Sequence, residues 1–288
     1  MTLQIMLFLA SIGASMAAIA GPALADCSTL PNNATLKSAL SGSITAASGA
    51  NGGLGFNMWG TIVDTSGIVC AVAFSGADYT SQWLGSRVIS AQKANTGNAF
   101  SLGLGAGGTV IPISSANLFS AVQPGGSLYG LQHSNPVDTD VSYGNSTGGQ
   151  GNAPANGSSF GTTSDPLVGQ RVGGINVFGG GLALYSRGGI RVGGLGVSGD
   201  TSCTDHMVAW WTRNLLGLDG FKTVGGVNSQ AGYPDNIIFD IGVNPDGSGS
   251  AGAFPYSGGD VGHSAKGFGH PTCLNPPDLT TLPAVSTQ

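Results

Sequence analysis

Residues 178–217 constrain the fold more than any other stretch, because they specify two strands, a glycine corner and a helix in one continuous run. Residues 182–185 are apolar and residues 190–197 alternate large apolar with small or polar side chains, which predicts a β-hairpin. From residue 204 to the C-cap Gly217, apolar side chains recur at three- and four-residue steps, which predicts a helix. The face that this helix turns to the sheet is expected to hold Met207, Val208, Trp211 and Leu215.

The glycine corner of this stretch also matches the dinucleotide-binding motif G-x-G-x-x-G. Gly194, Gly196 and Gly199 are its three glycines, and Asp219 stands at the distance expected for its acidic residue. In a dinucleotide site the acidic residue ends a second strand, whereas Asp219 follows the predicted helix directly, with no strand between them. A tight strand-to-helix corner is therefore the better interpretation.

The first 25 residues predict an export signal. They are almost uniformly apolar and close with Ala23-Leu24-Ala25, an A-x-A-like cleavage site, although no lysine or arginine precedes the apolar part. The stretch is too short for a stable transmembrane span, and Asp26 before Cys27 argues against a lipoprotein. We expect a secreted or periplasmic protein without a membrane span.

Composition supports this location and excludes some functions. The four cysteines allow two disulfides in three connectivities. We expect Cys27 to pair with Cys70 and Cys203 with Cys273, since a bond to Cys203 would stabilise the flexible glycine-rich tail most. Only 8% of residues are charged, all 14 acidic residues are aspartates, and the net charge is -5. Glutamate-based chemistry is excluded, and a nucleic-acid partner is not expected.

The other expected elements are a helix at 36–47, strands at 56–63 and 68–74 joined by a turn at Asp64, and a helix at 81–101. Further candidates are a short helix at 114–122 and strands at 172–177 and 236–243. Residues 144–164 are almost all Gly, Ser, Asn and Thr, which predicts a mobile surface excursion.

Two blocks of this sequence resemble the GlcG/HbpS-like haem-binding family. The first is NMWGTIVDTSGIVCAVAF at 57–74, followed by Ser86-Arg87-x-Ile89 and Lys93-Ala94-x-Thr96, which is similar to the family's strand-Asp-x-x-Gly-strand unit and its Lys-Ala-x-Thr-Ala helix. The second combines the glycine-rich hairpin at 179–184, the corner at 193–199 and Asp205-x-x-x-Ala209. Together the blocks cover roughly 110 residues, and several motifs in order are more specific than any one of them. The chain departs from the family at Leu182, where the family has Pro, and at Gly97.

The resemblance implies an α/β (α+β) profilin-like sandwich, in which a five-stranded antiparallel sheet is flanked by helices. We expect one domain at 26–288, with its core at 27–102 and 171–219. A Gly/Ser-rich insert at 103–170 and a C-terminal extension at 220–288 are added to that core.

Candidate ligand-binding residues come from the corner and the long helix. Arg87 and Lys93 could hold a haem propionate, and Gly194, Gly196 and Gly199 leave backbone bare at a helix N-terminus that favours an anion. His206 is the expected metal ligand, with His133 arriving from the insert as a second. For each histidine a structural or solvated role is the alternative, and His263 and His270 stay undecided. The spacing of the histidines encodes no zinc motif.

The sequence thus predicts an exported protein that binds haem, or a similar small anionic ligand, as its cofactor and partner. Two alternatives stay open, a low-turnover enzyme such as one degrading haem at the same cleft, and a module that contacts the cell surface. A binding protein is favoured over an enzyme. Whether the chain forms a homo-oligomer is left open by the sequence.

Overall fold

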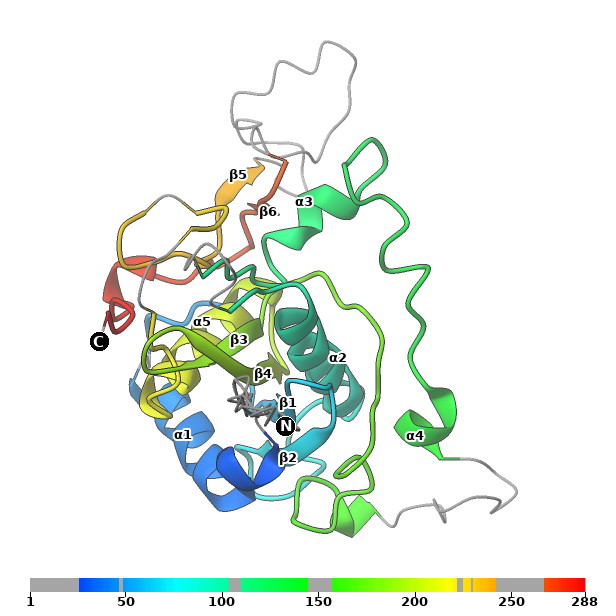
Figure 1. Cartoon of the computed structure of the whole chain (residues 1–288). Helices are drawn as coiled ribbons and strands as arrows, with labels where there is room; N and C mark the ends of the chain where they lie inside the picture. The colour runs from blue at the N-terminus through cyan, green and yellow to red at the C-terminus, as the bar shows by residue number, and fades with distance from the viewer. Residues whose placement is uncertain are drawn as a thin grey trace, which may run out of the picture.

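The computed structural model describes residues 26–46, 49–103, 110–144, 157–221, 225–228, 230–241 and 267–287. A central sheet has helices on both of its faces; the C-terminal extension and α3 lie beyond one end of this core, and the insert then runs past α2 toward α4 near the other end (Figure 1). The expected export signal lies outside the described residues. No helix in the described part combines the length and the apolar character that a membrane crossing requires.

The sheet has four antiparallel strands in the order β2-β1-β4-β3. The strands are β1 (Trp59–Asp64), β2 (Val69–Phe74), β3 (Gly181–Ser186) and β4 (Ile190–Ser198). The Asp64 carboxylate accepts hydrogen bonds from the backbone N–H groups of Ser66 and Ile68, so the predicted turn role of this residue is confirmed. The two predicted hairpins are both present, and their strands meet as β1 and β4 at the centre of the sheet.

The predicted fifth strand is the main departure from the expected sheet. Residues 172–177 form no strand, and only isolated bridges link Arg171 and Gly173 to other segments. Within the candidate at 236–243, the described residues form β5 (Phe239–Ile241), which pairs in parallel with β6 (His270–Pro271) in a separate ladder, and residues 242–243 lie outside the described part. Glycines at 173 and 174, both with positive φ, interrupt the first candidate.

Three long helices enclose the sheet. The helices α1 (Asn33–Ala46) and α5 (Ser202–Leu215) pack against each other and cover one face, and α2 (Ser86–Ala99) covers the other. Figure 1 shows α2 on the side of the sheet opposite α1. Shorter helices are α3 (Leu118–Val122) and α4 (Thr139–Tyr143) in the insert, with 3-10 turns at Cys27–Thr29, Gly157–Ser159 and Leu279–Thr281.

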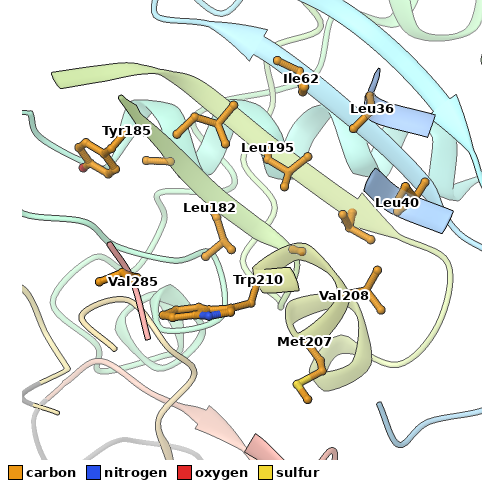
Figure 2. Close-up of a cluster of buried hydrophobic side chains, with 14 of the residues drawn as sticks. Leu36, Leu40, Ile62, Leu182, Tyr185, Leu195, Met207, Val208, Trp210 and Val285 are labelled. Atoms are coloured by element: carbon orange, nitrogen blue, oxygen red, sulfur yellow. The ribbon is translucent and has the colours of Figure 1, made fainter. Parts of the chain in front are cut away.

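The face under α1 and α5 is a side-chain core. Leu36 and Leu40 of α1 meet Ile62 and Leu195 of the sheet, and Met207, Val208 and Trp210 of α5 continue the cluster (Figure 2). The apolar face predicted for α5 needs a correction, because Leu215 is half exposed whereas Trp210 is buried. The cause is the C-terminal extension, since Trp210 stacks on Tyr233 and donates to the Pro283 carbonyl oxygen at 2.9 Å.

Over β3 and β4, the face under α2 is packed backbone to backbone, whereas over β1 and β2 the side chains of Val88 and Ala91 join Trp59 and Val63 in a buried apolar cluster. A Cβ atom at Gly194 or Gly196 of β4, or at Gly181 of β3, would clash with carbonyl oxygens of α2. Gly97 of α2 in turn lies against the backbone of Leu182. The absence of side chains at these positions lets the helix approach the sheet closely, and close approach of another backbone is a known role of glycine inside a strand.

Candidate ligand-binding site

The corner between β4 and α5 is held rigidly by its own side chains. Thr201 caps α5, with its hydroxyl 3.4 Å from the backbone N of Thr204. The Asp200 carboxylate accepts from the backbone N–H groups of Leu54 and Phe56, at 2.9 Å for each. Gly199 has a φ of 154° and lies against the backbone of residues 57 and 58. The corner therefore has the strand-turn-helix form predicted from the sequence.

Lys93 and Asp205 form a buried ion pair beneath this corner. The Lys93 Nζ lies 2.6 Å from Asp205 Oδ2 and 3.2 Å from the carbonyl oxygen of Val197, and it stands over the ring of Phe178. Both side chains are fully buried. Burial lowers the pKa of Lys93 and raises the pKa of Asp205 to about 6, since loss of water disfavours each charge. The pair joins the two sequence blocks that carry the family resemblance.

Arg87 forms a second buried ion pair, with Asp165 of the insert. Its Nε donates to Asp165 Oδ2 at 2.9 Å, its other contact is with Asp165 Oδ1, and its guanidinium lies over the ring of Phe160. Asp165 also accepts from the backbone N–H groups of Gly161 and Leu167. Phe160 of this stretch is thus packed against α2 and Gly161 is bonded to Asp165, so this part of 144–164 is not wholly a surface excursion. Residues 145–156 lie outside the described residues.

These ion pairs change the interpretation of the two cations. Arg87 and Lys93 were expected to face a ligand, but the structure directs both into the protein, toward Asp165 and Asp205. Likewise, the backbone of Gly194 and Gly196 is not bare, because α2 covers it. The scarce charges and the glycines of this chain therefore serve packing at these four positions.

His206, the expected metal ligand, is fully buried on the first turns of α5. Its Nε2 lies 3.2 Å from Asn236 Oδ1, and the backbone N–H of Ile237 is within reach of both that oxygen, at 2.9 Å, and the imidazole. The opposite nitrogen, Nδ1, is buried with no hydrogen-bond partner in the described structure. Burial lowers the pKa of His206 to about 4, so the ring is neutral at pH 7.

These contacts favour one tautomer of His206. If Nε2 carries the proton and donates to Asn236 Oδ1, the Ile237 N–H still has that oxygen as its acceptor. Nδ1 then keeps a free lone pair, and the other ring nitrogen is oriented by a carbonyl oxygen, as it is in metal-binding histidines. Chemically, His206 fits a nitrogen ligand, whereas Arg87 and Lys93 do not fit as ligands for propionates.

The insert and the extension together cover this corner. Asn117 donates to the Asn236 carbonyl oxygen at 2.9 Å and accepts from the Ile238 N–H at 2.9 Å. Ser115 donates to the Phe178 carbonyl oxygen and accepts from the Gly181 N–H. Sequence reasoning missed both asparagines, because a side chain that joins segments 119 residues apart leaves no local pattern.

The other histidines divide between surface and interior. His133 is exposed in a loop of the insert, whereas His206 is fully buried in the core. His263 lies outside the described residues. His270 is buried, and its Nε2 is 2.6 Å from the hydroxyl of Ser202, a pair that the sequence gave no reason to expect. A third buried ion pair, Arg213 with Asp235, was also missed.

Both expected disulfides are present. Cys27 bonds to Cys70 of β2, and Cys203 of α5 bonds to Cys273 of the extension. The second bond fixes the extension beside the first turn of α5, next to Ser202 and His206. No cysteine is left free.

An aromatic hollow lies elsewhere on the surface. Phe56 and Trp83 are 39% and 52% exposed, their rings meet edge to face at 5.1 Å, and they line a hollow of about 320 Å³ together with Asn57 and Gln82. The hollow is lined by these two aromatic side chains and by polar residues, with no histidine among them.

No family model and no curated protein matches the chain. Among solved structures, the chain is similar to the Klebsiella pneumoniae protein ORFY, with 20% identity over 64% of this chain and 88% of that one, at a TM-score of 0.37. A PduOC complex with haem is 22% identical over 63% and 89% of the two chains, with a TM-score of 0.37. HbpS is 14% identical over 65% and 91%, with a TM-score of 0.34. At TM-scores below 0.5, these likenesses do not assign a ligand to this chain.

Proposed function

We propose that the protein binds haem, or a similar small ligand with a metal, through His206. The observation that carries the proposal is the buried neutral imidazole whose Nδ1 has no partner and whose Nε2 is held by Asn236. The motif resemblance of the two sequence blocks supports haem as the ligand. When bound, haem would supply an iron that accepts this nitrogen.

Access to His206 is the step that the protein itself controls. Because the side chain is fully buried, a porphyrin reaches Nδ1 only if covering segments move. The segment around Asn236 is held over His206 by hydrogen bonds to Asn117 as well as by the Arg213–Asp235 pair. We infer that binding is slow relative to diffusion, as is usual when a conformational change must come first.

Titration with haemin tests the proposal. We expect a Soret band with the parent protein and an affinity loss of about tenfold or more in His206→Ala, since each 1.4 kcal/mol is a factor of ten. His133→Ala is the matched control, because this histidine is exposed in a loop of the insert and not buried beside the corner. The earlier expectation of His133 as a second ligand predicts instead that its loss shifts the Soret maximum.

A third variant separates the buried corner from the aromatic hollow. If haemin binds His206→Ala as tightly as the parent and Trp83→Ala weakly, the ligand occupies the surface hollow and the assignment to His206 is wrong. If reductant and oxygen bleach the bound Soret band with release of iron, the enzymatic alternative is supported over simple binding. Absence of any haemin binding would contradict both.

We also propose that the protein is exported to the periplasm or outside the cell. Two disulfides and the apolar N-terminal stretch support this location, because disulfides persist in oxidising compartments. Fractionation of expressing cells, together with the N-terminal sequence of the product, tests it. We expect the mature chain to begin at Asp26.

A further inference from the structure

A serine and a histidine that the proposed haem site does not use meet at the start of α5. The Ser202 Oγ lies 2.6 Å from His270 Nε2, and the His270 Nδ1 lies 2.7 Å from the Pro271 carbonyl oxygen. A carbonyl oxygen can only accept, so Nδ1 carries the proton of the neutral ring. Nε2 is then left with a lone pair, and it accepts the hydrogen of the Ser202 hydroxyl. This is the tautomer that a general base for a serine nucleophile requires.

The surroundings hold this pair in place from several directions. The backbone N–H of Gly179 donates to Ser202 Oγ at 2.7 Å, and the ring of Phe119 lies 5.3 Å from the imidazole. His270 is 4% exposed, and its backbone N–H donates to the Ile238 carbonyl oxygen in the β5–β6 ladder. The disulfide between Cys203 and Cys273 clamps the segment that carries the histidine to the helix that carries the serine. Such support from rigid elements is what a functional pair needs.

Backbone N–H groups that could stabilise an oxyanion lie beside the serine. Ser202 is the first residue of α5, it is half buried, and a strand-turn-helix connection presents it at the end of β4. Ser202 and Cys203 are the first two residues of α5, where backbone N–H groups have no acceptor within the helix, whereas the N–H groups of Thr204 and Asp205 are bonded to Thr201. Free N–H groups beside a nucleophile are the donors that stabilise a developing oxyanion.

We propose that Ser202 and His270 form an acyl-transfer site that takes small carboxylic esters. Ser202 Oγ attacks the ester carbonyl carbon while His270 Nε2 takes the hydroxyl proton. The bond from that carbon to the alcohol oxygen breaks, and the imidazolium gives the proton to the leaving alcohol. Water, activated by the same nitrogen, then hydrolyses the acyl-serine and releases the acid.

The protonation state of His270 agrees with this role. Burial, with a smaller contribution from the charge of Lys93, lowers the pKa of His270 to about 4. The base is therefore neutral and available from weakly acidic to neutral pH. A base with so low a pKa is a weak proton acceptor, so we expect slow turnover.

Labelling with diisopropyl fluorophosphate tests the proposal on the full, oxidised chain. The serine oxygen forms a bond to phosphorus, fluoride leaves, and the proton passes to His270. Intact mass and peptide mapping should find one adduct on Ser202 and none in Ser202→Ala. Ser75→Ala is the matched control, because Ser75 is also half buried and hydrogen-bonded but has no histidine partner. This control should label as the parent does.

The role of the histidine is tested separately. His270→Gln should lower the labelling rate by about a hundredfold, the lower end of what general-base catalysis contributes. In the parent, the rate should fall as the pH falls through about 4, which requires no variant to fold. No adduct, an adduct on another residue, or a rate independent of both His270 and pH would overturn the proposal. Because the assay contains no haem, its result is independent of the haem titration.

Discussion

The two faces of the central sheet are packed in different ways over β3 and β4, although they belong to the same two strands. Under α1 and α5, large side chains such as Leu40, Ile62 and Leu195 fill the space between helix and sheet. Under α2, glycines at 181, 194 and 196 remove the side chains and bring two backbones together. The first face can adjust to a lost methyl group by relaxation of its neighbours. At the glycines of the second face, no side chain is available to move aside.

Two adjacent residues of β4 give the most direct way to break this comparison. Gly196→Ala adds one methyl group against the Ser90 carbonyl oxygen of α2, and we expect it to destabilise by more than about 4 kcal/mol, above ordinary overpacking because the obstacle is backbone. Leu195→Ala, on the other face, should cost about 3 kcal/mol as a cavity. Urea unfolding of both variants checks the order. A Gly196→Ala protein as stable as the parent would refute the backbone-packing explanation.

Substitution of one lysine on each side of the sheet extends the comparison from glycines to charged side chains. Lys93→Met on α2 leaves Asp205 charged and buried without its partner, so we expect a loss of about 3–5 kcal/mol. Lys37→Met on α1 removes an exposed cation that lies over the ring of Phe74, which should cost no more than about 1 kcal/mol.

Adding Asp205→Asn to Lys93→Met should restore part of the stability, because the uncompensated charge is gone. Chemical denaturation of the single and double variants gives the coupling directly. Strictly additive losses would show that Lys93 and Asp205 do not act as a pair.

Removal of each disulfide in turn compares the stability of the core with that of the C-terminal extension. Replacing Cys203 and Cys273 by serine should lower the stability by about 2–4 kcal/mol, and protease sensitivity should rise first in the extension. Replacing Cys27 and Cys70 should loosen the start of the chain on β2 instead. Calorimetry with limited proteolysis distinguishes the two. Equal cleavage patterns in both variants would contradict a local effect.

A change of pH should give the smallest effect. In the folded protein, the pKa values of His206 and His270 are about 4, below the ordinary 6.5. Between pH 6.5 and pH 4, these two histidines are therefore protonated only in the unfolded chain, and the free energy of unfolding falls as the pH falls. Asp205 opposes this, because its folded pKa of about 6 exceeds 3.8. Asp235 and Arg213 face His206, and Lys93 faces His270. We expect a net loss of about 2 kcal/mol from pH 7 to 5.5.

Unfolding midpoints at the two pH values measure this loss, and His206→Gln should reduce it by well over half, because the opposing contribution of Asp205 is unchanged. A protein that gains stability on acidification would show that Asp205 dominates over the two histidines.

The sequence predicted the elements of this fold that depend on a periodic or local pattern of residues. Both hairpins, the helix after the glycine corner and the turn at Asp64 follow from patterns within a few residues. It did not reveal the partners of Lys93 and Arg87, which lie 112 and 78 residues away, and exposed positions were the reasonable default for both. The glycines were recognised as a corner but assigned to a ligand, because a bare backbone looks the same whether a ligand or a helix covers it.

The site was predicted less completely than the fold. His206 was chosen as the candidate ligand because it follows the corner directly in the sequence, and this assignment stays a prediction, whereas Asn236 and His270 come from an extension without periodic pattern. Trp210 shows the same limit, since its burial depends on Tyr233 and Pro283 rather than on the helical repeat of α5.

The order of the disulfides along the chain bears on how the protein is made. The four cysteines pair consecutively, first with second and third with fourth. In a chain that emerges from its N-terminus, Cys70 is available to Cys27 before either later cysteine exists in the same space. Each bond can therefore close with its native partner as it appears, and no intermediate needs to exchange thiols between the two pairs. Oxidative maturation should then depend on a thiol oxidase far more than on a disulfide isomerase.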